Sequence, residues 1–179
     1  MILGEVSTIS GIQLTNDPNT EFDYPVDVIS GQQGKVLFTV DARRVIVEYN
    51  PSPKEVTIFS GGLEQQYNSS YDTTYANTRF WTITGLNYNS AGDLYVTDFG
   101  ASVIVVLKNG ISTIAAGQQY TLGLADGNAL TTATLSYPNF LLMDSTDDIY
   151  FTDLDYSSSI YKIRKFSTSA SNNVHIFIQ

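Results

Sequence analysis

Carboxylates in the last third of the chain are the residues best suited to chemistry. Five aspartates occur from residue 144 to residue 155, and Asp126 precedes them. Calcium binds several oxygen ligands at once, and closely spaced aspartates can supply them. The candidate ligands for such a site are Asp126, Asp144, Asp148 and Asp153.

The spacing of this acidic cluster favours solvated turn carboxylates over a metal site. The order Asp-x-x-Asp-Asp at 144–148 is not that of an EF-hand loop. Alternation along a strand also sends neighbouring side chains to opposite faces of the sheet. We therefore expect no cofactor, and a calcium ion is the alternative.

Catalytic sets built on a nucleophile have little to draw on in this sequence. His175 is the only histidine, and there are no cysteines. A Ser/His/Asp set would have to use His175, and disulfides and thiolate metal sites are excluded. Because His175 lies in a strand-like run, a packing or surface role is favoured. We expect the chain not to be an enzyme.

The charge of the chain argues against nucleic acid as a partner. Nine basic residues face eighteen acidic ones, and the net charge is −9. Phosphate backbones reward lysine and arginine through counterion release. The basic clusters are small: Arg43-Arg44, and Lys162, Arg164 and Lys165. No apolar run approaches 18 residues, so we also expect no membrane insertion.

Aromatic side chains gather between residues 67 and 81 and form the candidate partner-binding surface. They are Tyr67, Tyr71, Tyr75, Phe80 and Trp81. Exposed tyrosines among serine and asparagine are typical of adaptable contact surfaces. The alternative is that these rings cover the outer edge of a sheet. Asn68 begins an Asn-Ser-Ser sequon and is a glycosylation candidate; the alternative is a chance triplet.

The elements that must position these residues repeat three times. The repeated phrases are Leu37–Asp41, Leu94–Asp98 and Ile149–Asp153. Their alternation predicts strands, and the spacings of 57 and 55 residues between their aspartates predict an array of like units. Because the same residue ends each phrase, we expect the aspartates to cap the turn that follows rather than to form one active site.

Each unit contains enough β-branched runs for four short antiparallel strands. A second run follows each phrase after a hairpin-length gap, and Asn109-Gly110 marks a tight turn before a third. The opening strands follow Pro25, Ile83 and Pro138. The predicted fold is all-β, with four-stranded β-propeller blades. The predicted divisions of this one propeller-type domain are a closing strand at 1–11 and blades at 12–61, 62–117 and 118–179.

The third unit resembles the NHL repeat. The resemblance lies in Gly123-Leu124-Ala125-Asp126-Gly127, Pro138, Asp148–Asp153 and Ile160–Ile163. The second unit departs from the pattern with Ile83 at the proline position and an irregular lead-in at 64–79. The resemblance implies propeller blades and says little about function.

Two enzyme types are known among proteins of the NHL kind, and the resemblance lets us weigh both. Zinc-dependent lyases that amidate peptides need several histidines and disulfides, which this sequence lacks. Six-bladed relatives that hydrolyse lactones or condense amines use carboxylates around an axial metal drawn from several blades. Part of such an enzyme, with axial carboxylates, is the alternative function.

Three blades and one strand are too few to close a propeller, which needs about four to eight blades. The open sheet edges must pair with something. The chain is expected to be an excerpt of a longer protein, half of a six-bladed dimer, or the subunit of an open filament. Its partner is therefore a protein, either the rest of a longer chain or other copies.

The favoured function is a non-catalytic structural or protein-interaction module, with self-assembly as an option. Serine, threonine, asparagine, tyrosine and glycine are plentiful, as on many extracellular or cell-surface proteins. Met1 is followed at once by a strand-like run, without a secretory signal. The alternative is a cytoplasmic protein; we favour an excerpt of a surface protein.

Overall fold

The computed structural model describes residues 24–62, 68–169 and 171–178, and its regular structure is strand and short 3-10 helix. This confirms the predicted all-β class. The first strands are β1 Pro25–Ser30, β2 Val36–Val40, β3 Val45–Asn50 and β4 Glu55–Ser60. The next are β5 Thr73–Thr74, β6 Ile83–Tyr88, β7 Leu94–Asp98, β8 Val103–Lys108 and β9 Ile111–Ala116. The last are β10 Gly127–Asn128, β11 Pro138–Met143, β12 Ile149–Asp155, β13 Ile160–Ser167 and β14 Asn173–Ile178.

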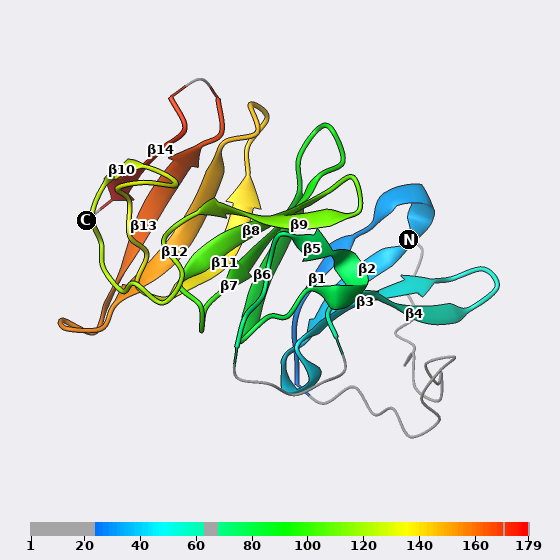
Figure 1. Cartoon of the computed structure of the whole chain (residues 1–179). Coiled ribbons are helices and arrows are strands. Elements are labelled where there is room, and N and C mark those ends of the chain that lie inside the picture. Colours follow the sequence, from blue (N-terminus) through cyan, green and yellow to red (C-terminus); the bar gives the residue numbers. More distant parts are fainter. Residues whose placement is uncertain (1–23, 63–67, 170, 179) are drawn as a thin grey trace, which may run out of the picture.

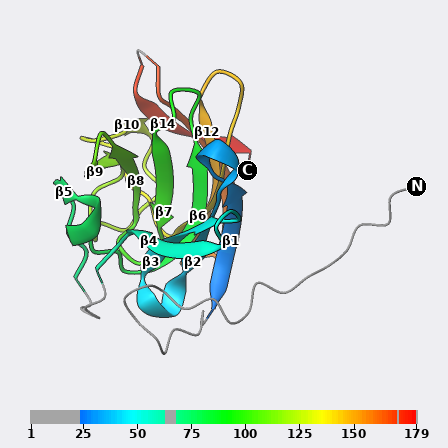
Figure 2. The ribbon, with the colours of Figure 1, turned by 90° about the vertical axis from the view of Figure 1, so that its right-hand side faces the viewer.

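The strands form three antiparallel sheets, which we call sheets 1, 2 and 3. Sheet 1 has the order β1-β2-β3-β4, sheet 2 β5-β9-β8-β7-β6, and sheet 3 β10-β14-β13-β12-β11. Sheet 2 lies between the other two (Figure 1). Figure 2 views this stack from the side of sheet 1. The 3-10 helices η1 Gln32–Gly34, η2 Asp41–Arg43 and η3 Tyr75–Asn77 lie in the connections.

Sheets 2 and 3 carry a short fifth strand that the sequence did not predict. β5 pairs with β9, and β10 pairs with β14. The segments that precede β6 and β11, which we call the lead-ins of sheets 2 and 3 (residues 68–82 and 118–137), therefore run along the outer edges of their own sheets. An uncovered edge exposes unpaired N–H and C=O groups. The lead-ins therefore protect these two edges. The predicted closing strand at 1–11 lies outside the described residues.

Local sequence explains the tight turns and the ends of the sheets. Asn109 and Gly110 have φ angles of 51° and 81°, the geometry that an Asn-Gly hairpin turn requires. Gly61 and Gly117 follow the fourth strands of sheets 1 and 2 at positive φ. A Cβ atom on either would lie 2.6 Å from a backbone oxygen, so glycine is required at both positions.

The residue pairing shows which positions of the three sheets are equivalent. Asp98 pairs with both Ile83 and Val103, and Asp153 pairs with Pro138. In sheet 1 the residue that pairs with Pro25 and Val45 is Val40, not Asp41. The prediction that Asp41 repeats the role of Asp98 is therefore wrong. Asp41 begins η2 instead.

Two apolar cores hold the stack together. Leu37 and Ile46 of sheet 1 pack with Leu94, Val96 and other residues of sheet 2. The second core lies between sheets 2 and 3. Sheet 2 contributes Ile104 and Ala116, and the other members are Ala129, Ala133, Leu135, Leu141, Ile149, Phe151, Phe166 and Val174. Each fully buried Val, Leu, Ile or Phe side chain contributes about 1.5–3 kcal/mol to the stability of the folded chain. A third cluster of Val40, Val45, Val47 and Val56 is buried on the other face of sheet 1.

The edge strands β1, β6 and β11, which we call the inner strands, lie side by side at the same edge of the three sheets. Polar contacts fix this arrangement. The backbone N–H of Leu86 donates to Asp27 Oδ2 at 2.9 Å. The hydroxyl of Thr84 donates to the carbonyl of Pro138 at 3.2 Å. Each inner strand also has a shift in pairing register near its start. Such irregularities twist a strand.

The turns between the first two strands of each sheet also touch one another. Gln32 of the first turn donates through Nε2 to the carbonyl of Gly92 in the second, at 3.3 Å. Ser90 of the second turn donates through its backbone N–H to Asp147 Oδ1 in the third, at 2.8 Å. The three sheets are thus linked at the cores, the inner strands and the turns. In the described part of the chain, no helix has the length and apolar character needed to cross a bilayer.

Candidate functional site

Asp98, at the end of β7, is fully buried and accepts several hydrogen bonds. The backbone N–H groups of Trp81 and Thr82 donate to it at 2.8 and 3.0 Å. The hydroxyl of Tyr71 donates at 2.7 Å, and the N–H of Ala101 at 3.2 Å. Asp98 therefore ties the lead-in of sheet 2 and the start of β6 to the end of β7.

Asp153, at the equivalent position of sheet 3, has a buried cation beside it. The N–H groups of Ser136 and Tyr137 donate to Oδ1 at 3.0 and 2.8 Å. Nη1 of Arg164 lies 3.0 Å from Oδ2, and both side chains are fully buried. Burying one charge without the other would be costly, so the two groups depend on each other.

Arg164 also binds the lead-in of sheet 3. Its Nη1 donates to the carbonyl of Thr134 at 2.7 Å, and its Nη2 donates to the carbonyl of Ala125 at 2.9 Å. The same Nη2 lies 3.0 Å from Oδ1 of Asp126. One guanidinium therefore joins two metal candidates, Asp126 and Asp153, and takes the place that a metal ion between them would need.

Burial perturbs both strand-end acids in the same direction. It raises the pKa of Asp98 above the ordinary value of 3.8, against the opposing effect of the hydrogen bonds from Thr82 and Trp81. Burial also raises the pKa of Asp153 above 3.8, while the Arg164 guanidinium opposes it. A neighbouring cation, Arg164, opposes the rise for Asp153, whereas hydrogen bonds alone oppose it for Asp98.

These contacts correct the predicted role of the repeated aspartates. Asp98 accepts one bond from its own turn, from the N–H of Ala101. The other backbone donors come from segments 16 or 17 residues upstream. In sheets 2 and 3 the acids fasten the residues just before β6 to the end of β7 and the residues just before β11 to β12. With their oxygens so engaged, they are poorly placed to bind substrate or a metal ion.

The remaining metal candidates hold the turn between β11 and β12. Asp144 accepts bonds from the hydroxyl of Thr146 and the N–H of Asp148. In the matching turn of sheet 2, the amide oxygen of Asn89 accepts the equivalent bond from the N–H of Asp93. Because an amide serves there, the turn does not need the carboxylate charge.

Asp148 completes this account of the acidic cluster. It lies 2.6 Å from Nζ of Lys165. Within residues 24–62, 68–169 and 171–178, no three histidine, cysteine, aspartate or glutamate side chains are grouped so that they could hold a metal ion. The sequence identified carboxylates that matter, but their partners are backbone amides and cations.

Burial removes two residues from the predicted aromatic contact surface. Tyr71 is 9% exposed and Phe80 is 1% exposed, and both belong to the core between sheets 1 and 2. Tyr75 stacks on Phe59 with ring centroids 5.4 Å apart, and Trp81 packs edge-on against Tyr120 at 5.5 Å. Tyr67 lies outside the described residues. Apart from Tyr67, the rings pack on the protein itself, in the core or on a neighbouring ring. A role of this segment in partner binding stays a prediction.

Asn68 is exposed at the beginning of a fixed segment. The N–H of Ser69 donates to the Tyr120 hydroxyl at 2.6 Å, and Nε2 of Gln119 donates to the Ser69 carbonyl at 2.9 Å. These bonds hold the residue that follows Asn68. Glycosylation of Asn68 stays a prediction.

Sheet 3 exposes apolar side chains on the face that points away from sheet 2, which we call its outer face. Ile46, Ile104 and Ile163 are equivalent, since they pair with Thr39, Thr97 and Thr152 respectively. Ile46 and Ile104 are fully buried, and Ile163 is 38% exposed. Among the described strands, no further sheet follows sheet 3 to cover it.

Other apolar side chains surround Ile163 on sheet 3. Exposed large side chains of β11, β13 and β14 include Leu142, Tyr161 and Phe177. Tyr150 packs edge-on against Phe177 with centroids 4.9 Å apart, and Lys165 Nζ lies 5.3 Å from the Tyr150 ring centroid. His175 pairs with Lys165 and is half-buried. This outer face is a candidate contact surface among the described residues.

Comparison with solved structures identifies the architecture. An uncharacterised protein from Bacteroides thetaiotaomicron superposes with a TM-score of 0.73 at 19% identity, over 90% of this chain and 39% of its own. An auxiliary nutrient binding protein from Bacteroides ovatus gives 0.64 at 19%, over 84% and 39%. Virginiamycin B lyase from Staphylococcus aureus gives 0.58 at 15%, over 94% and 44%. The chain has a β-propeller-like fold.

These likenesses extend to the fold alone, because the identities are low. The chain spans about two fifths of the length of these structures. The sequence matches no established family profile and no curated protein. The likeness does not single out the NHL repeat among propeller types.

Proposed function

We propose that this chain is a non-catalytic structural and protein-interaction module built from NHL-type propeller blades. Its outer face on sheet 3 binds another four-stranded sheet of the same kind. The carrying observation is the series Ile46, Ile104 and Ile163, in which sheet 2 covers the first, sheet 3 covers the second and the third is exposed. An exposed apolar face of this type marks an interaction site.

The sheet that binds this outer face contributes an apolar face of its own. That face is equivalent to the one that sheet 2 packs against sheet 1 and that sheet 3 packs against sheet 2. In sheet 3 that face holds Ile149, Phe151 and Phe166, which meet Ile104 of sheet 2. The occupant is a further blade, from the rest of a longer extracellular or cell-surface protein or from another copy. The partial coverage of the larger propeller structures supports this proposal.

The state of the acids supports a non-catalytic role over the propeller-enzyme alternative. Asp98 and Asp153 are fully buried and occupied by backbone donors, Tyr71 and Arg164. A catalytic carboxylate must reach the reacting atoms of a substrate. The lyase among the similar structures is evidence for fold alone.

Native mass measured by light scattering over a range of protein concentrations tests the proposal. We expect particles larger than one 19.7 kDa chain, or a monomer that binds the apolar dye anilinonaphthalene sulfonate. The double variant Leu142→Lys/Ile163→Lys should abolish both. Ser158→Lys/Ser171→Lys, in exposed turns of sheet 3, is the matched control. A monodisperse monomer with no affinity for the dye would refute the proposal.

A further inference from the structure

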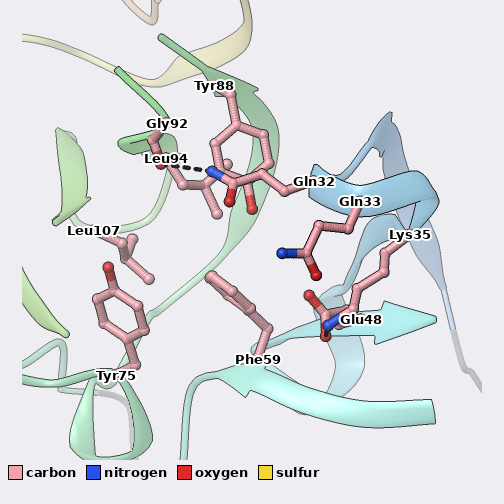
Figure 3. A pocket seen from close by; sticks show the side chains of 10 residues that line it. All are labelled: Gln32, Gln33, Lys35, Glu48, Phe59, Tyr75, Tyr88, Gly92, Leu94 and Leu107. Atoms are coloured by element: carbon pink, nitrogen blue, oxygen red, sulfur yellow. Dashed lines mark hydrogen bonds and ion pairs between the residues drawn. The ribbon is translucent and has the colours of Figure 1, made fainter. Parts of the chain in front are cut away.

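A cavity of about 310 Å³ lies between sheet 1 and sheet 2, apart from the outer face of sheet 3. Figure 3 shows its walls: Phe59 from β4, Tyr75 from η3 and Tyr88 from β6. The buried side chains of Leu94 and Leu107 also line it. Small-molecule sites typically begin at about 300 Å³ and combine aromatic walls with a few placed polar groups.

The aromatic walls are partly exposed. Phe59, Tyr75 and Tyr88 are all half-buried, so their rings present surface to the cavity rather than to the core alone. Phe59 and Tyr75 are already stacked, with an interplanar angle of 35°. Burial and the nearby Glu48 raise the pKa of Tyr88 to about 12. The Tyr88 hydroxyl therefore keeps its proton at neutral pH and can donate a hydrogen bond.

The polar groups of the cavity carry no net charge. Lys35 Nζ and Glu48 Oε1 form an ion pair at 2.7 Å, and each side chain is partly exposed. Gln33 is exposed at the rim, and in Figure 3 its amide points toward the space between Tyr88 and Phe59. An amide offers both donors and an acceptor. The cavity therefore suits a neutral ligand with many hydroxyl groups.

The backbone at Gln33 strengthens this reading. Its φ and ψ angles are 57° and 33°, inside η1. A residue with a side chain in the left-handed region costs stability, which glycine in its place would avoid. Strained residues of this kind gather at ligand sites. Here the strain places a side-chain amide at the rim of an aromatic cavity.

We propose that this cavity binds a neutral carbohydrate of one or two pyranose rings. The C–H face of such a ring packs on Phe59, Tyr75 or Tyr88, as apolar groups pack on aromatic rings. Its hydroxyls bond to the Gln33 amide and to Lys35 and Glu48 at the rim. The volume of about 310 Å³ lies at the lower end of the range of small-molecule sites, which suits a ligand this small.

Saturation-transfer difference NMR on the full chain tests this site with glucose, maltose, cellobiose and N,N′-diacetylchitobiose as probes. At least one sugar should receive saturation, strongest at its ring C–H protons. Phe59→Leu and Gln33→Gly should each weaken binding by about fivefold or more, because each removes one wall or one amide. Gln33→Gly keeps the left-handed backbone, so its loss of binding does not come from misfolding.

Matched controls separate the cavity from general effects. Ser159→Gly changes another exposed residue with a positive φ, of 55°, and Phe177→Leu changes an exposed ring on sheet 3. Both should bind the sugar as the unmodified chain does. No saturation of any sugar by the folded chain, or binding that both cavity variants leave unchanged, would overturn the proposal. So would binding of tetramethylammonium in place of the sugars, since that would indicate a cation cage.

Discussion

Sheets 2 and 3 share one residue register but neutralise their strand-end acids differently. At one equivalent position, sheet 2 has Val105 paired with Val96, and sheet 3 has Arg164 paired with Phe151. The lead-in of sheet 2 supplies a donor to the acid, the Tyr71 hydroxyl. The lead-in of sheet 3 supplies acceptors, such as the carbonyl of Thr134. A carboxylate and carbonyls can meet only through a donor, and Arg164 provides it.

Sheets 2 and 3 therefore have the same acid but differ in the group that donates to it. In both sheets the acid accepts hydrogen bonds from two backbone N–H groups, which lie just before β6 in sheet 2 and just before β11 in sheet 3. The partner is set by whether the lead-in presents donors or acceptors. Four sets of substitutions test this difference between sheets 2 and 3.

The largest effect is expected for Arg164→Ala. It leaves Asp153 buried without a cation and frees the carbonyls of Ala125 and Thr134. Removing one member of a buried pair costs about 3–5 kcal/mol. Urea unfolding of both forms measures this loss. Lys165→Ala, which breaks a partly exposed pair with Asp148, should cost less than about 1 kcal/mol. Equal losses would contradict the special place of Arg164.

The next effect compares one apolar position in two sheets. Ile104→Ala should lower the free energy of unfolding by about 2–4 kcal/mol, because its cavity lies in the core between sheets 2 and 3. Ile163→Ala should cost less than about 1 kcal/mol in the monomer, because that side chain is 38% exposed. Denaturant titration at a concentration where the chain is monomeric gives both values. A large loss from Ile163→Ala would show that the outer face is covered.

Asp98 should give the unfolding equilibrium a dependence on pH. Its pKa is raised in the folded state, so the folded state holds its proton longer than the unfolded state does. This contribution to stability is fully present below the ordinary pKa of 3.8 and is lost as pH rises through the raised folded value. Asp98→Asn should remove that decline. It should also cost about 1–3 kcal/mol at low pH, because the amide nitrogen cannot accept a hydrogen bond, whereas both oxygens of a protonated carboxyl can.

Chemical denaturation from pH 3.5 to pH 7 separates these two effects of Asp98→Asn. Asp144→Asn is the matched control, since Asn89 fills the same turn position in sheet 2. Bonds from Thr146 lower the pKa of Asp144, so this acid contributes a rise in stability with pH. Asp144→Asn removes that rise and should leave the decline at least as steep as in the unmodified chain. A pH profile identical in Asp98→Asn and the unmodified chain would rule out Asp98 as its source.

The smallest effect concerns the hydroxyl that takes the place of a cation in sheet 2. Tyr71→Phe removes the bond to Asp98 at 2.7 Å and should cost about 1–2 kcal/mol. Tyr161→Phe removes an exposed hydroxyl and should cost less than about 0.5 kcal/mol. Thermal unfolding compares the two. Equal effects would mean that the Tyr71 hydroxyl does not stabilise the acid.

Local pattern was enough to predict the strands and their turns. Alternation in Leu94–Asp98 and the Asn109-Gly110 pair each act over a few residues, so the sequence shows them directly. Their repetition at a fixed spacing then predicted the propeller-like fold. The short strands β5 and β10 were missed, because two residues carry too little pattern.

The errors about the site come from contacts across the sheets. The prediction aligned Asp41 with Asp98 because both residues are aspartates. The pairing aligns Val40 with Asp98 instead, because four residues separate Val40 from its partner Val45, as four separate Asp98 from Val103. Counting back from the third strand would have placed Val40 correctly. The bonds from Arg164 to Asp126 and Asp153 join residues 38 and 11 positions apart, which no local pattern shows.

The bonds between successive turns, from Gln32 to Gly92 and from Ser90 to Asp147, have a geometric consequence. Each bond joins the turn at one end of a sheet to the equivalent turn of its neighbour, so it helps to fix the rotation from one sheet to the next. A fixed rotation repeated around an axis determines how many sectors complete a circle. If such sheets form a ring, these pairs of small turns would help to set how many sheets it contains.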